Sequence, residues 1–314
     1  MPGRILITGS SGQIGSELTE VFVRRYGRER VLSTDVIPQN RKDCQTAVLD
    51  VTSHTAVAET IRSNDIGTVI HLAAILSAKG EKMPELAFDV NLIGMRNVLR
   101  ASLEGGVDRV FFPSTIGIFG PDTPKENVPI ETVTRPTTMY GITKLFCEQL
   151  GEYYYRKYGL DVRGLRLPGI VSYKTLPGGG TTDYSIEMMR AAAEGENYRC
   201  FLRNDTKLPM MYMPDAIDSI IRLLESPSSS LKHRTDFNVM AFSFSPAELE
   251  AEIRKTIPSF TVSYAPDERQ AIADSWPRSL DSSAAASEWG FSPVFTLSEM
   301  VKDMLSHLVP LLKK

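Results

Sequence analysis

The sequence has few cysteines, no long apolar run and no excess of charge of either sign. Its three cysteines, Cys44, Cys147 and Cys200, are widely spaced and form no CxxC pair, which is typical of buried free thiols in a reducing compartment. No apolar stretch approaches the roughly 18 residues that a membrane span requires. The formal charge is -3 and the basic residues form no runs, so a nucleic-acid-binding surface is not expected. We therefore expect a globular protein without nucleic-acid or membrane partners.

The N-terminal segment does not resemble a targeting signal. Its apolar run, residues 4–8, is too short for a signal-peptide core and begins too early for a transit peptide. The expected location is intracellular: the cytoplasm, or the mitochondrial matrix if a transit peptide preceded this sequence. The length of 314 residues suffices for one large domain or two closely packed ones.

Short apolar segments alternate with helix-length segments in the first half of the chain. Continuous apolar strands separated by helices are typical of a parallel sheet that is covered on both faces. We therefore predict an α/β, doubly wound parallel sheet of the Rossmann type in residues 1–168. A smaller mixed α/β region that mainly binds substrate is expected in residues 169–314, of which about 207–240 return to the first domain. The predicted strands are Ile5–Thr8, Val31–Thr34, Thr68–Leu72, Arg109–Pro113 and Asp161–Leu167.

A glycine-rich turn, Gly9–Gly15, separates the first predicted strand from a helical pattern that begins near Ser16. Glycines at this place permit a tight turn and let the backbone approach a pyrophosphate, while the helix N-terminus supplies free amides. Asp35 ends the second predicted strand, where a carboxylate binds the adenosine ribose hydroxyls and repels a 2′-phosphate. The pattern predicts NAD binding rather than NADP binding. By contrast, His71 lies in an apolar run and is interpreted as a core histidine.

Tyr140 and Lys144 lie four residues apart at the start of a predicted helix that extends to Tyr158, so they share one helix face. A nearby ammonium favours tyrosine phenolate, which would let Tyr140 accept a substrate hydroxyl proton nearer neutral pH. Thr115 follows the strand at Arg109–Pro113 and can hydrogen-bond the same substrate oxygen. A YxxxK pair is common by chance, but its position after the fourth predicted strand of a dinucleotide fold favours an alcohol-oxidation site.

These motifs resemble those of the extended short-chain dehydrogenase/reductase family over nearly the whole chain. The resemblance implies that Tyr140 is the general base, that Lys144 also binds the nicotinamide ribose and that Thr115 orients the reacting oxygen. It further implies direct hydride transfer to NAD, and the sequence offers no His or Cys cluster for a metal. The cofactor-binding residues that it implies are Gly9, Gly12, Gln13, Ile14, Gly15, Asp35, Asp50, Val51, Leu72, Ala73, Ala74, Asn91, Tyr140, Lys144 and Pro168.

Two later segments, residues 178–184 and 207–215, resemble those of the short-chain type of L-threonine 3-dehydrogenase within this family. The resemblance implies NAD-dependent oxidation of L-threonine to 2-amino-3-oxobutanoate. Asp183 can pair with the substrate ammonium, whereas a flexible loop with an N-cap aspartate is the plainer alternative. Ser77 and Trp276 are alternatively a turn residue and a packing residue. The implied substrate-binding residues are Ser77, Thr115, Tyr140, Gly180, Thr181, Thr182, Asp183 and Trp276.

Two other functions fit the same cofactor motifs. A UDP-sugar epimerase or dehydratase resembling UDP-galactose 4-epimerase normally clamps its diphosphate with an arginine, but Leu208 occupies that position here. Lys207 beside it does not reproduce a bidentate guanidinium. A non-catalytic dinucleotide sensor usually lacks the catalytic residues that this chain retains. The family also implies a homodimer through helices near 89–103 and 140–158, although their apolar faces could instead pack on the sheet.

Overall fold

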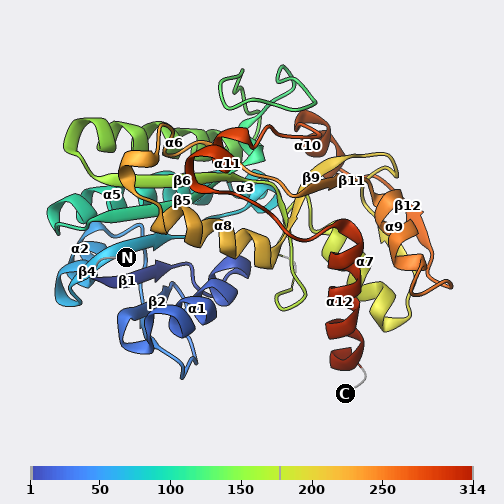
Figure 1. Ribbon diagram of the computed structural model, residues 1–314, viewed down its shortest axis with the longest axis horizontal. Coiled ribbons are helices and arrows are strands. Elements are labelled where there is room, and N and C mark those ends of the chain that lie inside the picture. The colour runs from blue at the N-terminus through green and yellow to red at the C-terminus, as the bar shows by residue number, and fades with distance from the viewer. Residues whose placement is uncertain (1–2, 177, 313–314) are drawn as a thin grey trace.

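The computed structural model describes residues 3–176 and 178–312 and is organised around a large parallel sheet (Figure 1). Within these residues, seven strands form this sheet in the order β10-β6-β5-β4-β1-β2-β3, and all neighbouring strands are parallel. The strand bounds are β1 Arg4–Thr8, β2 Val31–Asp35, β3 Gln45–Val48, β4 Ile66–His71, β5 Arg109–Thr115, β6 Asp161–Leu167 and β10 Phe237–Asn238. The predicted doubly wound α/β fold is confirmed. The strand order reverses between β1 and β4, where open parallel sheets bind their ligands.

Helices cover both faces of this sheet, as its apolar strands require. One face packs on α1 (Gln13–Tyr26) and α8 (Met213–Glu225). The other face packs on α2 (His54–Ser63), α5 (Gly94–Glu104) and α6 (Met139–Tyr158). The segments between these elements contain short helices: η1 Arg28–Arg30, α3 Ser77–Lys82, α4 Pro84–Ala87, η2 Phe88–Ile93, η3 Ile116–Ile118 and η4 Ser228–Ser230.

The second half adds a smaller region beside the carboxyl ends of the main strands (Figure 1). A mixed sheet in the order β11-β9-β7 lies next to a two-stranded sheet of β12 and β8. The strands are β7 Gly169–Val171, β8 Tyr198–Cys200, β9 Leu208–Tyr212, β11 Phe242–Phe244 and β12 Val262–Tyr264. The helices are α7 Tyr184–Glu194, α9 Pro246–Arg254, α10 Arg269–Ser275 and α12 Leu297–Leu312, whereas α11 Ser283–Trp289 packs on the main sheet beside β10.

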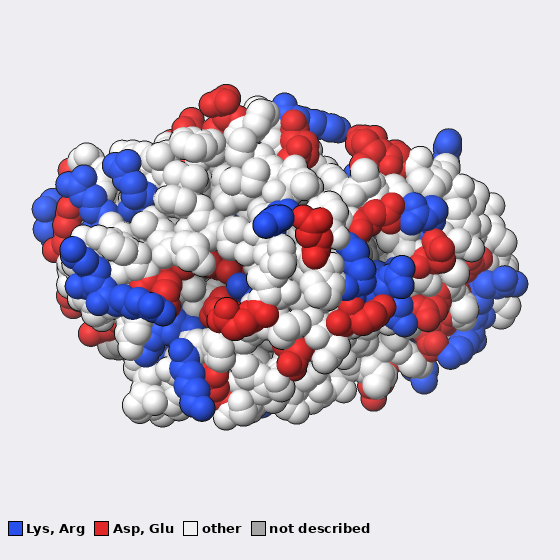
Figure 2. All heavy atoms as spheres, turned by 90° about the horizontal axis from the view of Figure 1, so that it is seen from above, with Lys and Arg blue, Asp and Glu red and all other residues white. Residues whose placement is uncertain are grey.

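The three cysteines are buried and free, as predicted. None of the helices in the described part of the chain combines the length and the apolar character that a membrane span needs. Figure 2 shows Lys and Arg interspersed with Asp and Glu over the face seen there.

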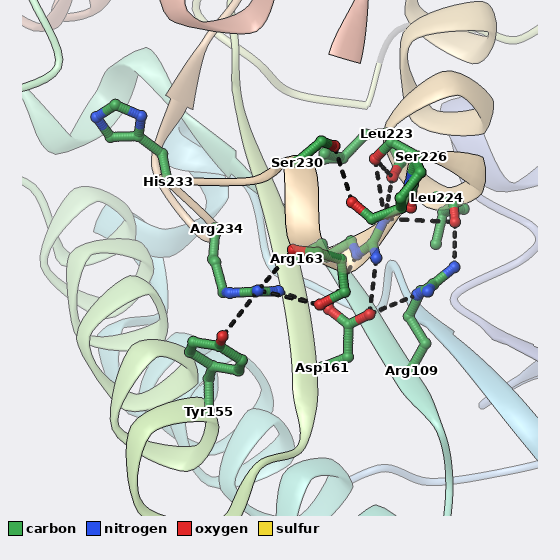
Figure 3. A network of polar contacts seen from close by, with 12 residues as sticks. Arg109, Tyr155, Asp161, Arg163, Leu223, Leu224, Ser226, Ser230, His233 and Arg234 are labelled. Atoms are coloured by element: carbon green, nitrogen blue, oxygen red, sulfur yellow. Dashed lines mark hydrogen bonds and ion pairs between the residues drawn. The ribbon is translucent and has the colours of Figure 1, made fainter. Parts of the chain in front are cut away.

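A buried charge network fastens the opposite edge of the main sheet (Figure 3). Asp161, the first residue of β6, accepts hydrogen bonds from Arg109 at 2.9 Å, Arg163 at 2.7 Å and Arg234 at 3.0 Å. The Arg163 side chain is fully buried and also donates to the Ser226 carbonyl oxygen just beyond α8, at 2.9 Å. These contacts bind α8 to the amino ends of β5 and β6, far from the ligand-binding edge of the sheet.

Candidate active site

A cavity opens at the carboxyl ends of β1, β4 and β5, and it extends from the glycine turn to the loop before α7. This position is the one that the reversal of strand order favours for a ligand. The cavity brings together most residues of the predicted site: Gly9, Gly12, Gln13, Ile14, Gly15, Leu72, Ala74, Ser77, Thr115, Tyr140, Lys144, Pro168, Gly180, Thr181, Thr182, Asp183 and Trp276.

The glycine turn is shaped by two glycines that the fold requires and one that it does not. Gly9 has φ +66°, and a Cβ there would lie 2.5 Å from the Ala73 nitrogen. A Cβ on Gly15 would lie 2.4 Å from the Gly9 oxygen, so the close packing of α1 on the turn depends on Gly15. At Gly12 a Cβ would meet only the Gly9 oxygen at 3.3 Å. The absence of a side chain at Gly12 leaves its backbone open to the cavity, where it would let a pyrophosphate approach.

The start of α1 also fits a dinucleotide. The helix begins at Gln13 rather than near Ser16 as predicted, because the end of the glycine motif itself forms the first helical turn. No side chain caps this helix, so its first amides are free for an anion. Asp35, the last residue of β2, accepts a hydrogen bond from the Ser11 amide at 2.9 Å. The carboxylate therefore lies beside the glycine turn, where residues of this pattern would hold the adenosine ribose of NAD.

Replacing Asp35 with Ala tests this placement. We expect the preference for NAD over NADP to fall by about tenfold, because the variant loses one charge-assisted hydrogen bond and the charge that repels a 2′-phosphate. The measurement is the ratio of kcat/KM for the two cofactors. Asp108→Ala is the control, since Asp108 is exposed near the opposite ends of the strands. An unchanged ratio would place the discrimination at other residues.

The three predicted catalytic residues meet at the carboxyl end of β5. The strand extends through Thr115, two residues beyond its predicted end. Thr138 caps α6 by accepting a hydrogen bond from the Gly141 amide at 3.1 Å, which places Tyr140 and Lys144 in its first turns. Lys144 donates to the Pro113 carbonyl oxygen at 2.8 Å, and its Nζ lies 5.8 Å from the centroid of the Tyr140 ring.

The pKa of Tyr140 is shifted in the direction opposite to the prediction. Burial raises the pKa of Tyr140 to about 12, although a hydrogen bond with Thr115 opposes this shift. Burial also lowers the pKa of Lys144. The predicted lowering of the Tyr140 pKa toward neutral pH by the Lys144 ammonium is not observed here, because burial is the largest influence on this pKa and raises it.

Five of the predicted cofactor residues do not line the cavity: Asp35, Asp50, Val51, Ala73 and Asn91. Asn91 is 2% exposed and binds both backbone groups of Ile75, at 2.7 Å and 3.0 Å. It therefore fixes the segment that follows β4. The Asp50 carboxylate accepts from the Thr52 amide at 2.9 Å, and Val51 is buried.

His71 is a core histidine, as predicted. Its side chain is 4% exposed, and its Nδ1 lies 2.8 Å from the Thr8 hydroxyl. Burial lowers the pKa of His71 to about 3, so the imidazole is neutral at ordinary pH.

The far end of the cavity is formed by the loop before α7 and by Trp276. Asp183 is 6% exposed, and its Oδ2 accepts hydrogen bonds from the Gly179 amide at 2.9 Å and the Gly180 amide at 2.7 Å. It folds back over the glycine loop and does not cap α7 with its side chain. Thr181 lies 3.3 Å from the Ser77 hydroxyl. Trp276 is 5% exposed, and its indole Nε1 is buried without a hydrogen-bond partner among the described residues.

The segment at 207–215 offers no anion clamp. Leu208 is 1% exposed in the core of the second region. The Lys207 ammonium lies 3.9 Å from Glu248 and outside the cavity. Among the described residues that line the cavity, Lys144 is the one cationic side chain.

Sequence reasoning missed cavity residues that act through the backbone. Pro113 presents the carbonyl that receives the Lys144 ammonium. The Ile170 carbonyl oxygen accepts a hydrogen bond from the side-chain Nε2 of Gln13 at 3.3 Å. Neither contribution depends on the side chain, so no residue pattern marks it.

Comparison with known proteins gives likenesses along nearly the full length. A sequence profile of the NAD dependent epimerase/dehydratase family matches residues 5–239. An uncharacterized epimerase/dehydratase of Staphylococcus haemolyticus is 43% identical over 312 residues, covering 97% of each chain. The holo form of a GalE-like L-threonine dehydrogenase from Cupriavidus necator is 46% identical, with a TM-score of 0.96, over 97% of this chain and 99% of that chain. A monomeric L-threonine 3-dehydrogenase from a metagenome is 42% identical, with a TM-score of 0.95, over 98% and 99%.

Proposed function

Because the chain belongs to the NAD dependent epimerase/dehydratase family, we propose that it oxidises L-threonine at its hydroxyl carbon to 2-amino-3-oxobutanoate, with NAD as the cofactor. The observation that carries the proposal is the continuous cavity. It joins Thr115 and Tyr140 to the Gly180–Asp183 loop and Trp276, and so offers both oxidation chemistry and groups for a small amino acid. The neighbouring threonine dehydrogenase structures support the same substrate.

Three side chains take part in the proposed reaction: Thr115, Tyr140 and Lys144. Thr115 donates or accepts a hydrogen bond at the substrate hydroxyl and aligns it with Tyr140. Ionised Tyr140 takes the hydroxyl proton while the C–H bond at the same carbon releases a hydride. NAD, when bound, supplies the acceptor for that hydride. Lys144 supplies the positive charge beside the tyrosine, and its hydrogen bond to Pro113 holds the ammonium in place.

The polar ends of threonine match the far end of the cavity. We assign the carboxylate to the hydroxyls of Ser77 and Thr181 and to the unpartnered indole N–H of Trp276. A buried donor without a partner is costly, and a carboxylate oxygen removes that cost. Asp183 receives the Gly179 and Gly180 amides on Oδ2, and we assign its other oxygen to the substrate ammonium. Because the same carboxylate holds the Gly179 and Gly180 amides, we also assign Asp183 the role of fixing the shape of the glycine loop.

The rival sugar-nucleotide function is disfavoured by charge. A substrate diphosphate needs cations beyond those that serve the cofactor. Leu208 is buried in the core and Lys207 faces Glu248, so this part of the chain supplies none to the cavity.

One substrate panel tests the proposal. Purified protein is incubated with NAD and either L-threonine, L-serine, 3-hydroxybutyrate or a UDP-sugar, and NADH is followed by its absorbance. We expect NADH formation to be fastest with L-threonine. Isomerisation of a UDP-sugar without net NADH would instead establish the epimerase, and NAD binding without turnover of any substrate would establish the sensor.

We further propose that the protein is a homodimer through the face formed by η2, α5 and α6. Ile142, Phe146 and Tyr153 lie on one side of α6 and are 38–49% exposed, and Phe88 of η2, which packs on α6, is 40% exposed. Exposed apolar groups on neighbouring elements favour association. Sedimentation equilibrium tests this proposal. A measured mass of twice the chain mass would support the homodimer, whereas the mass of a single chain would indicate a monomer like the metagenomic relative.

A further inference from the structure

The segment between Thr115 and Tyr140 reaches across to the end of α10 (Figure 1). Residues 119–138 of this segment, the connecting segment, contain no helix or strand. Their backbone nevertheless pairs with residues 278–281: the Arg278 amide donates to the Lys125 carbonyl at 2.7 Å, and the Asp281 amide donates to the Val128 carbonyl at 2.9 Å. The segment that separates the two catalytic residues in sequence is thus attached to the chain that follows Trp276.

The Lys125 side chain adds further contacts to this backbone pairing. Its ammonium donates to the carbonyl oxygens of Asp274 at 2.9 Å, Ser275 at 3.0 Å and Trp276 at 3.2 Å. The first two residues end α10, where carbonyls lack helical partners and the helix dipole attracts a cation. The Lys125 side chain is half-buried, so these charge-assisted hydrogen bonds are only partly screened by water.

Trp276 connects this attachment to the cavity. Its carbonyl oxygen receives the Lys125 ammonium, while its side chain lines the cavity with Tyr140 and Asp183. Arg203 binds the carboxylate of Asp274, near the end of α10, at 2.7 Å. The end of α10 is therefore bound by two cations, and the backbone that carries the indole is one of the groups that Lys125 contacts.

We propose that Lys125 is a positioning residue of the substrate pocket, which holds the backbone at Trp276 and so fixes the indole wall that contacts the substrate. Lys125 does not line the cavity, so it acts through Trp276. Losing it weakens substrate binding more than the chemical step, because the proton acceptor on α6 and the glycine turn stay in place. The identity of the substrate in this inference rests on the proposed function, whereas the control of Trp276 does not.

The test uses Lys125→Met, which keeps an aliphatic stem and removes the ammonium. We expect KM for L-threonine to rise by about tenfold, because a displaced indole loses its hydrogen bond to the substrate carboxylate, while kcat changes less and the Kd for NAD is unchanged. Lys125→Arg keeps donors at this position and restores part of the affinity. Lys302→Met is the matched control, because Lys302 is an exposed lysine on α12.

A second measurement needs no substrate. The chain has two tryptophans, so Trp289→Phe leaves Trp276 as the single tryptophan whose fluorescence is followed. Phenylalanine is chosen because Trp289 lies in the core against the aromatic rings of Phe237 and Phe291. In this background, Lys125→Met should increase acrylamide quenching of Trp276 and shift its emission to the red, whereas Lys302→Met should not.

The two measurements separate the inference from the proposed function. Increased quenching in a protein whose wild type oxidises no threonine would support the role of Lys125 and overturn the proposed substrate. Threonine oxidation by the wild type, with unchanged KM and unchanged quenching in Lys125→Met, would overturn the role of Lys125. Equal losses of NAD affinity, kcat and unfolding midpoint would also overturn it, because they indicate a general structural defect.

Discussion

Tyr140→Phe should lower kcat for L-threonine by about 10²–10⁴-fold while the Kd for NAD stays close to that of the wild type. The substitution removes the phenolic oxygen that accepts the proton and keeps the ring, so the loss is that of one general base. Turnover is followed as NADH formation at saturating substrate, and NAD binding is measured separately by calorimetry. Tyr158→Phe is the control, since Tyr158 ends the same helix and is 47% exposed.

The pH dependence gives this prediction a second readout. Burial raises the pKa of Tyr140 to about 12 in the protein, so the protonated form, which cannot take a proton, dominates at neutral pH. The rate of the wild type should therefore rise with pH between about pH 7 and pH 9. The residual rate of Tyr140→Phe should not show this rise. Near-normal turnover of the variant, or an identical pH profile, would remove Tyr140 from the role of general base.

The main sheet was predictable because its strands are short apolar runs that are buried on both faces. Asp161–Leu167 has the predicted bounds, and β1 and β2 differ from their predictions by one residue. β3 was missed, since its four residues are largely exposed and carry no apolar run. β10 contains only two residues, too few for any periodicity.

The candidate site, like the main sheet, has features that the sequence predicts and features that it does not. Gly9–Gly15, Tyr140 and Lys144 were predictable because each group lies at a fixed spacing within one turn or one helix. The destination of a hydrogen bond was not predictable where it is made to a backbone carbonyl or amide. Asn91 binds Ile75, and Asp183 binds its own glycine loop. Those partners are set by the tertiary path of the chain, which spacing does not record.

Asp161→Ala should lower the free energy of unfolding by about 3–5 kcal/mol, the typical cost of removing one partner from a buried ion pair. Arg109, Arg163 and Arg234 all donate to this carboxylate (Figure 3). The variant leaves three guanidinium groups with no carboxylate between them, of which Arg163 is fully buried. Asp218→Ala is the control, because Asp218 forms an exposed i,i+4 pair with Arg222, and such a pair contributes only about 0.3–0.5 kcal/mol.

The pH dependence of this loss identifies its electrostatic origin. Burial by itself raises the pKa of Asp161, but the hydrogen bonds and charges of Arg163 and Arg109 outweigh burial and hold the pKa below its ordinary value. A carboxyl whose pKa is lower in the folded protein stabilises the fold fully above its unfolded pKa of about 4 and loses that contribution as the pH falls through its folded pKa. Urea unfolding should therefore give a constant difference between wild type and Asp161→Ala from about pH 5 to pH 8, and a smaller difference in more acidic solution. A difference that stays the same at every pH would assign the loss to packing rather than to the charge of Asp161.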